Sequence, residues 1–159
     1  MDALLKALKE NALETPANLA RMLDLSEDEV RKRIDDYEKQ GVIRGYHAIV
    51  NEDQLAVSDV TAVIEVKVTP ERDGGFDRIA QRISRFDEVQ DLYLVSGAYD
   101  LLIFLKGDNL KDVAAFVSEK LSTLDHVTST TTHFMLKTFK ERGVLMAVAD
   151  DHERLAISP

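Results

Sequence analysis

Apolar residues recur at the spacing of an amphipathic helix in three consecutive stretches near the N-terminus. These stretches predict helices over about Asp2–Leu13, from Pro16 onward, and from Glu27 to Gly41. Because positions three and four apart share one helix face, each stripe is expected to face a common core. The residues expected to point inward are Leu4, Leu5, Leu8, Ala12, Leu19, Ala20, Leu23, Val30, Ile34 and Tyr37.

Helix start and stop signals bound these stretches. Thr15 is a candidate N-cap before Pro16, whose missing N–H is not needed in the first turn of a helix. Ser26, with Glu29 three residues later, has the pattern of a capping box. Gly41 predicts a left-handed C-cap. The second and third helices are therefore expected to be separated by only a short turn.

Two segments of different composition follow the third predicted helix. Residues 42–50 are largely apolar and predict two short strand-like pieces, so residues 1–50 together predict a winged helix-turn-helix that binds DNA. Residues 51–59 are mostly polar and lack a glycine-rich or serine-rich run. They predict a connector between two domains that is not a flexible tether.

From Val60 onward, strands with a period of two alternate with helical stripes. Residues 70–75 break the pattern after the first strand, and Ser96–Ala98 predicts a hairpin between the second and third strands. The expected strands are 60–68, 89–96, 99–106 and 127–140, and the expected helices are 76–86 and 110–121. This order is the ferredoxin-like βαββαβ arrangement, with both helices on one face of an antiparallel sheet. The fold class is therefore α+β, with the ferredoxin-like domain at 60–140 and a tail at 141–159.

Composition narrows the classes of function. Apolar residues make up 45% of the chain and charged residues 31%, as in ordinary globular proteins. Cysteine is absent, which excludes disulfides and thiolate metal sites. No apolar run is long enough to cross a membrane, so we expect a cytoplasmic protein with no membrane association.

The net charge of −9 argues at first against binding to nucleic acid, because basic side chains dominate affinity for phosphate. The first 50 residues, however, carry 8 basic and 10 acidic side chains, so they contribute only −2. The acidic excess therefore lies mainly outside the predicted DNA-binding part.

The third predicted helix is the one expected to enter the major groove of double-stranded DNA. Its basic residues opposite the inward stripe, with Arg44 on the wing, are candidates for phosphate or base contacts. The acidic residues that open the helix are explained either by capping and the helix dipole or by hydrogen-bond acceptance from cytosine N4. The mixed charge predicts modest affinity for each half-site. The DNA-binding candidates are Ser26, Glu27, Asp28, Arg31, Lys32, Lys39 and Arg44.

Motifs for catalysis, cofactors or metals are not apparent. The chain has no phosphate-binding glycine loop and no nucleophile elbow, so neither catalytic residues nor a cofactor are expected. Asp73-Gly74-Gly75 predicts a turn into a helix. His126 and His133 are an odd number of residues apart, which would place them on opposite faces of a strand. We therefore expect no metal site.

Two motifs in the predicted order of elements resemble a known family. Gly41-Val42-Ile43-Arg44-Gly45-Tyr46 follows the third helix, and Gly97-Ala98-Tyr99-Asp100 lies in the central hairpin of the βαββαβ domain. Together, over about residues 1–140, they are similar to the Lrp/AsnC family of feast/famine regulators. The resemblance implies DNA binding by homodimers, assembly of the dimers into tetramers or octamers, and response to an amino acid or a related metabolite.

The resemblance also implies an effector pocket between dimers, bordered by the central hairpin and the last strand. From spacing alone, Gly97 would supply a positive φ and Asp100 would cap N–H groups of the turn. As effector residues, Asp100 would bind an ammonium group, and glycine N–H groups or threonine hydroxyls would bind a carboxylate. The effector candidates are Gly97, Ala98, Tyr99, Asp100, Thr130 and Thr132.

Two other functions fit the same architecture. Sirohaem decarboxylases resemble it, but they are expected to carry a C-terminal motif with tryptophan, and this chain has no tryptophan. A metabolite sensor that has lost DNA binding is the third interpretation, because of the acidic surface. The leading hypothesis is a transcriptional regulator that binds DNA and responds to a small molecule.

Overall fold

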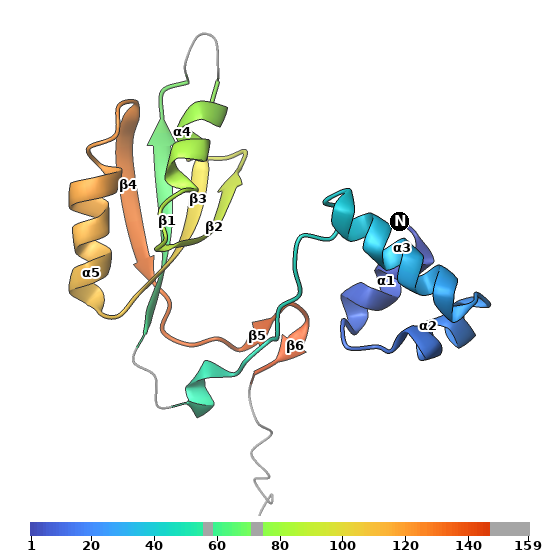
Figure 1. Ribbon diagram of the computed structural model, residues 1–159. Helices are drawn as coiled ribbons and strands as arrows, with labels where there is room; N and C mark the ends of the chain where they lie inside the picture. Colours follow the sequence, from blue (N-terminus) through green and yellow to red (C-terminus); the bar gives the residue numbers. More distant parts are fainter. Residues whose placement is uncertain (56–58, 71–74, 147–159) are drawn as a thin grey trace, which may run out of the picture. The chain divides into compact units, whose positions relative to one another are not determined.

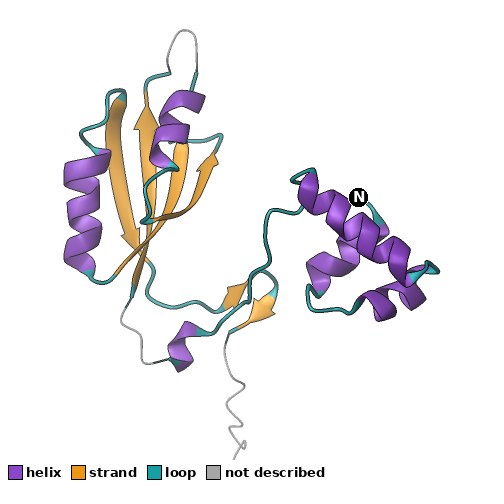
Figure 2. Cartoon of the chain, viewed as in Figure 1, coloured by secondary structure: helices purple, strands orange, loops and turns teal. Residues whose placement is uncertain are grey.

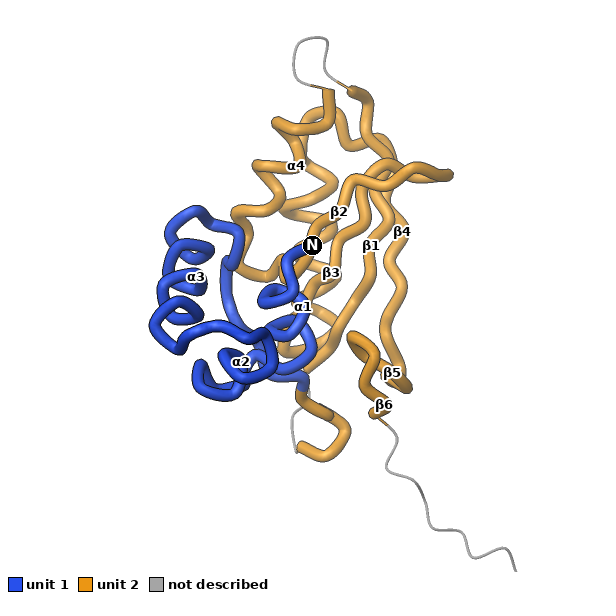
Figure 3. Tube along the Cα trace, turned by 90° about the vertical axis from the view of Figure 1, so that its right-hand side faces the viewer, with its two compact units in different colours: residues 1–49 blue, residues 50–159 orange. Residues whose placement is uncertain are grey.

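The computed structural model describes residues 1–55, 59–70 and 75–146. The chain forms two compact units, residues 1–49 and 50–159, which Figure 3 colours separately. Each unit has its own hydrophobic core. Unit 1 is helical, whereas unit 2 combines a sheet with helices (Figure 2).

Unit 1 consists of the helices α1 (Ala3–Glu10), α2 (Pro16–Leu23) and α3 (Glu27–Lys39). The predicted stripes are confirmed for most of their members, which are buried or packed against buried neighbours. Ala12 is an exception because α1 ends at Glu10, where the chain turns into an extended conformation. The buried side chains are Leu4, Leu8, Leu19, Ala20 and Val30.

A side-chain cap begins each of these helices. The Asp2 carboxylate accepts a hydrogen bond from a backbone N–H of the first turn at 2.7 Å. Thr15 Oγ1 accepts from the Asn18 N–H, and Ser26 Oγ accepts from the Glu29 N–H, both at 3.2 Å. Such caps contribute about 1 kcal/mol each, and helices as short as α1 and α2 depend on them.

Gly41 ends α3 in the left-handed conformation, with φ at +69°. The N–H groups of Val42 and Ile43 both donate to the Tyr37 carbonyl, at 2.9 and 3.1 Å. Glycine tolerates this φ because it has no Cβ. The predicted C-cap is confirmed.

The prediction of two strand-like pieces after α3 is wrong. Residues 42–50 contain no strand. The Tyr46 hydroxyl donates instead to the Glu38 carboxylate at 2.9 Å, which ties this segment to α3 through side chains. A strand needs a neighbouring backbone for its N–H and C=O groups, and no described segment of this chain pairs with these residues.

Unit 2 is built on a four-stranded antiparallel sheet in the order β2-β3-β1-β4. The strands are β1 (Val60–Val68), β2 (Val89–Leu94), β3 (Leu101–Gly107) and β4 (Val127–Phe134). The helices α4 (Asp77–Ile83) and α5 (Leu110–Ala115) cover one face, and the π-helical turn η2 (Phe116–Leu121) continues α5 (Figure 1). The predicted ferredoxin-like arrangement is confirmed.

The predicted alternation along β1 is also confirmed. Every second side chain is buried and faces the helices, and the β3 side chains opposite are buried with them. Burying one large aliphatic side chain contributes roughly 1.5–3 kcal/mol. The core residues of this face are Ala62, Ile64, Val66, Val68, Leu101, Ile103, Leu105, Ile79, Ile83, Val113, Phe116, Leu121 and Leu124.

The last strand ends earlier than predicted, at Phe134 rather than Lys140. The Met135 N–H still donates to the Thr61 carbonyl at 2.9 Å, but β1 starts at Val60 and offers little backbone beyond that point. A second, two-stranded sheet follows, made of β5 (Lys140–Glu141) and β6 (Val144–Leu145). The expected boundary between domain and tail, at 140/141, falls within β5.

The connector to the sheet is held in place by polar contacts. It contains one turn of 3₁₀-helix, η1 (Glu52–Gln54). Lys106 Nζ on β3 lies 2.9 Å from the Glu52 carboxylate and 3.0 Å from that of Asp59. Asn51 Nδ2 donates to the Met146 carbonyl at 2.6 Å. These contacts join residues 51, 52 and 59 to the rest of unit 2, and the expectation that the connector is not a flexible tether stays a prediction.

Two substitutions test whether the two units unfold independently. Leu19 and Ile64 are both fully buried, one in each core. Changing either to alanine leaves a cavity and should lower the free energy of unfolding of its own unit by about 2–5 kcal/mol. Hydrogen exchange measured by mass spectrometry should show lost amide protection in unit 1 for Leu19→Ala and in unit 2 for Ile64→Ala. Equal loss in both units for one variant would mean that they unfold together.

Candidate functional site

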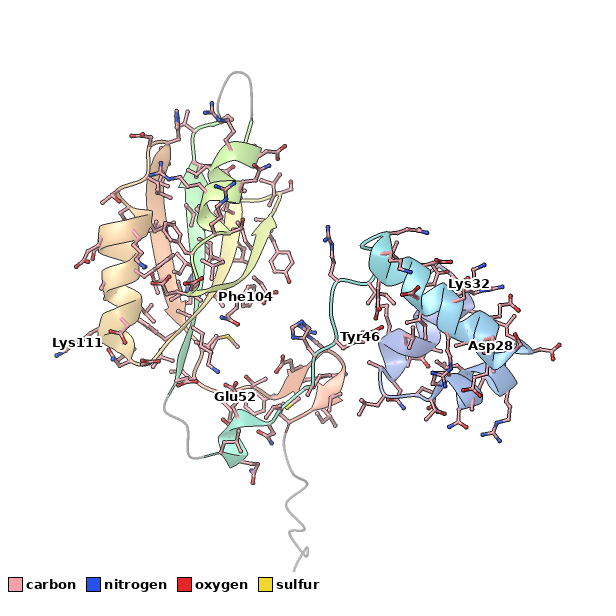
Figure 4. All side chains as sticks on the ribbon, in the orientation of Figure 1. Asp28, Lys32, Tyr46, Glu52, Phe104 and Lys111 are labelled. Carbon is pink, nitrogen blue, oxygen red and sulfur yellow. The ribbon has the colours of Figure 1, made fainter. Side chains whose placement is uncertain are left out.

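The outward face of α3 carries three of the seven predicted DNA-binding residues. With 100° between successive residues, Asp28, Lys32 and Lys39 lie on the side opposite the buried Val30. All three are exposed, and Figure 4 labels Asp28 and Lys32 on this helix. The structure thus gathers the outward candidates on one surface of unit 1.

Ion pairs along α3 hold three of its four basic residues. Glu27 pairs with Arg31 and Asp35 pairs with Lys39, each one helical turn apart. The hydrogen bond that Lys39 Nζ donates to the Asp35 carboxylate is the main reason why the pKa of Lys39 is raised. Arg31 and Lys39 therefore face solvent with a carboxylate beside them.

The third pair changes the predicted capping box. Arg33 Nη2 lies 2.6 Å from the Glu29 carboxylate. The Glu29 side chain therefore turns toward Arg33, and only the Ser26 half of the capping box forms. Sequence reasoning missed Arg33, although its spacing of four from Glu29 is the usual signal for such a pair.

Ser26 and Arg44 lie at the two ends of α3. The Ser26 hydroxyl is occupied by its cap contact with the Glu29 N–H. Arg44 folds back over the end of the helix, since a Cβ built on Gly41 would lie 3.2 Å from the Arg44 Cζ. Both side chains remain exposed at the surface.

The Gly97–Asp100 turn of unit 2 is held by the backbone of its neighbours. The Val95 N–H donates to the Asp100 carbonyl at 2.9 Å, and the Asp100 N–H donates to the Val66 carbonyl at 3.0 Å. Asp100 Oδ2 accepts from the Val68 N–H at 2.9 Å. The carboxylate therefore caps a backbone N–H, as expected from spacing, but one on β1.

The expectation for Gly97 is wrong. Its φ does not lie in the left-handed region, and a Cβ built on it would have no atom within 4 Å. Neither the backbone conformation nor close packing within the chain requires glycine here. The neighbouring Ala98 is exposed and Tyr99 half-buried.

Thr130 and Thr132 lie on the face of the sheet that the helices cover. They pair with Val66 and Ile64 of β1, which point into the core. Both threonines are half-buried. In a single chain β1 separates them from Asp100 by two inter-strand spacings, about 10 Å. One chain therefore does not bring the predicted effector residues together.

A groove of about 600 Å³ lies at the other end of the sheet. The connector, the uncovered sheet face and residues 135–146 line it, and none of the six effector candidates does. Tyr93 and Phe104 are among its apolar residues, with ring centroids 6.0 Å apart in an edge-to-face arrangement. The ion pairs of Lys106 with the connector lie along the same groove, and no motif in the sequence indicated them.

The described histidines and helices form neither a metal site nor a membrane-spanning segment. Among the described residues, no three His, Asp or Glu side chains are grouped so as to hold a metal. His133 lies 3.3 Å from Glu65 on the uncovered sheet face. His152 and the Asp73-Gly74 part of the predicted turn fall outside the described residues. No described helix combines the length and the apolar character needed to cross a membrane.

Comparisons with known proteins assign both parts of the chain. The family described as winged helix-turn-helix DNA-binding matches residues 3–44. The family described as Lrp/AsnC ligand binding domain matches residues 61–145. The two matches cover the helices of unit 1 and the sheet of unit 2.

Relatives cover nearly the whole chain. YugG of Bacillus subtilis, described as an uncharacterized HTH-type transcriptional regulator, is 46% identical over 157 residues, which are 98% of this chain and 95% of that protein. LrpA of Pyrococcus abyssi is 30% identical and covers 86% of this chain and 94% of its own length.

Solved structures share the fold. A transcriptional regulator of Neisseria meningitidis in complex with L-Met has a TM-score of 0.67 at 23% identity, with 89% of this chain and 93% of that chain covered. AsnC of Escherichia coli has a TM-score of 0.66 at 24% identity, with 91% and 97% covered. With the family matches and the relatives, these findings show that the chain belongs to the Lrp/AsnC family of transcriptional regulators.

Proposed function

We propose that the protein binds double-stranded DNA through α3 and alters transcription when an amino acid binds to unit 2 of a homo-oligomer in the cytoplasm. The observation that carries the DNA part is the exposed charged face of a capped α3, within a region that matches winged helix-turn-helix proteins. The two alternative functions are a sirohaem-decarboxylase-like enzyme and a sensor without DNA binding. No relative named above is described as either.

The charge of α3 supports modest affinity for each half-site. Arg31 and Lys39 must leave Glu27 and Asp35 to contact phosphate, but exposed ion pairs of this kind are weak and are broken at little cost. Lys32 is exposed and makes no ion pair with any described residue. It can contact DNA without breaking an existing interaction. Several half-sites bound by one oligomer would raise the overall affinity.

Lys32→Ala should weaken DNA binding and reduce its salt dependence. Losing one phosphate contact lowers the log–log slope of affinity against salt by about 0.9. Lys111→Ala, which removes an exposed lysine from α5 in unit 2, is the matched control and should change neither quantity (Figure 4). Binding to duplex from upstream of the protein's own gene would be measured at several salt concentrations. Wild-type affinity and slope for Lys32→Ala would exclude Lys32 from the interface.

The effector part of the proposal places the ligand where two or more copies meet. The predicted residues are separated by β1 in one chain, so Thr130 and Thr132 of one copy would have to approach the Gly97–Asp100 turn of another. Gly97 has free space around its Cβ position, which a ligand or a second copy can fill. The related regulator of known structure with bound L-Met supports an amino acid as the class of ligand.

Gly97→Ala and Asp100→Asn should weaken effector binding without harming the fold. Alanine at 97 meets no atom of the chain, and asparagine at 100 can still accept from the Val68 N–H while losing its charge. Loss of a charge-assisted hydrogen bond should cost about 10-fold or more in affinity. Calorimetry with L-Met first, then the other standard amino acids, would measure binding, with the exposed Asp108→Asn as control. Unchanged effector binding in both variants would mean that the Gly97–Asp100 hairpin is only a turn and does not contact the effector.

The uncovered sheet face supports association of copies. It carries apolar side chains that no described part of the chain covers fully, and Tyr93 is 50% exposed. An apolar patch left exposed on one face of a sheet often marks an interface. A dimer through this face, assembled further into tetramers or octamers, is the proposed form of the protein. The apolar residues of this face are Val63, Tyr93, Leu102, Phe104 and Met135.

Leu102→Asp should shift the protein toward monomers. Leu102 is half-buried in the middle of the uncovered face, between Glu65 and Tyr93, so a carboxylate there would be desolvated in an interface. Leu110→Asp makes the same change at a residue that is 56% exposed at the start of α5, and it should leave assembly unchanged. Sedimentation velocity at micromolar concentration would decide, with circular dichroism to check folding. Wild-type assembly of Leu102→Asp would place the interface elsewhere.

A further inference from the structure

The acidic residues in the first turn of α3 differ in what they contact. Glu27 is paired with Arg31 and Glu29 with Arg33. The Asp28 carboxylate, between them, is exposed and forms no hydrogen bond or ion pair with any residue in the described part of the chain. Among the three carboxylates of this turn, it is the one without an ion pair in the described part of the chain.

Asp28 also has the position from which a recognition helix contacts bases. It is the second residue of α3, directly after the Ser26 cap and Glu27. Lys32 follows one turn later on the same outward side (Figure 4). In helix-turn-helix proteins the N-terminal residues of the second helix reach base edges in the major groove.

A carboxylate at this place restricts what the helix can bind. It is repelled by phosphate, so Asp28 opposes nonspecific attraction to the DNA backbone. In the major groove it needs a hydrogen-bond donor, and the N4 amino group of cytosine is the partner that Asp and Glu ordinarily use. A site with cytosine at the right position therefore satisfies the carboxylate. Guanine and thymine present only acceptors or a methyl group there, and adenine places its N7 acceptor beside its N6 donor, so these bases satisfy the carboxylate less well.

We propose that Asp28 is a specificity-determining residue that accepts a hydrogen bond from cytosine N4 in each half-site. The inference rests on the proposed DNA binding by α3. Lys32 on the same side supplies the neighbouring positive charge, which holds the helix against DNA while Asp28 selects the base. The opposing explanation is that Asp28 only interacts with the dipole of α3, as acidic residues in a first turn often do.

Selection of sites from a random duplex library tests this inference in the full-length protein. Wild type should enrich sites with one cytosine position in each half-site, with discrimination of about 5- to 150-fold there. Asp28→Ala should lose preference at that position and keep it elsewhere. Asp28→Asn should change the preference to adenine, because an amide pairs with the N6 and N7 atoms of adenine.

Asp36→Asn is the matched control, since it removes the same charge from the same helix at a half-buried position away from the outward centre. It should raise affinity for all duplexes by a similar factor and leave the preferred sequence unchanged. The same enriched sites for wild type and both Asp28 variants would overturn the inference and leave only the dipole interaction. Wild-type binding without any sequence preference would overturn it while leaving DNA binding intact. If the wild type binds no duplex at low salt, both the inference about Asp28 and the proposed DNA binding by α3 are wrong.

Discussion

Strand β1 is the constraint on which unit 2 depends. Its backbone is hydrogen-bonded on both edges, to β3 and to β4, and its alternate side chains from Ala62 to Val68 are fully or almost fully buried under the helices. A shift of one residue would turn this buried set to the other face, so the register of both neighbours is fixed by the apolar pattern. The end of β1 at Val60 also limits how far β4 can extend.

The position of β1 has consequences for the proposed effector site. It places the Gly97–Asp100 turn on one side and Thr130 on the other, with Val66 between them. Within one chain the two groups belong to the same sheet but lie on opposite sides of β1. A ligand that contacts both kinds of residue therefore depends on assembly, which is the physical link between effector binding and oligomer packing in the proposed function.

Ion pairs divide the charged side chains of α3 into a paired and an unpaired group. Three acidic residues are paired with three basic residues one turn away, which reduces both the repulsion and the attraction that they would exert on phosphate. Asp28 and Lys32 are outside these pairs. The net charge of the helix therefore says less about DNA binding than the few groups that stay unpaired. Under the proposals above, these two groups contribute affinity and base preference.

The sequence alone determined the helices of unit 1, the order of strands and helices in unit 2 and the family. Periodicity, caps and Gly41 act over a few residues, so they can be read locally. Only the tertiary structure decided where β4 ends, that residues 42–50 form no strand, and that Thr130 and Thr132 face the helices. Each of these depends on whether a distant segment supplies a partner. The contact of Lys106 with Glu52, 54 positions away, could not be predicted from the sequence for the same reason.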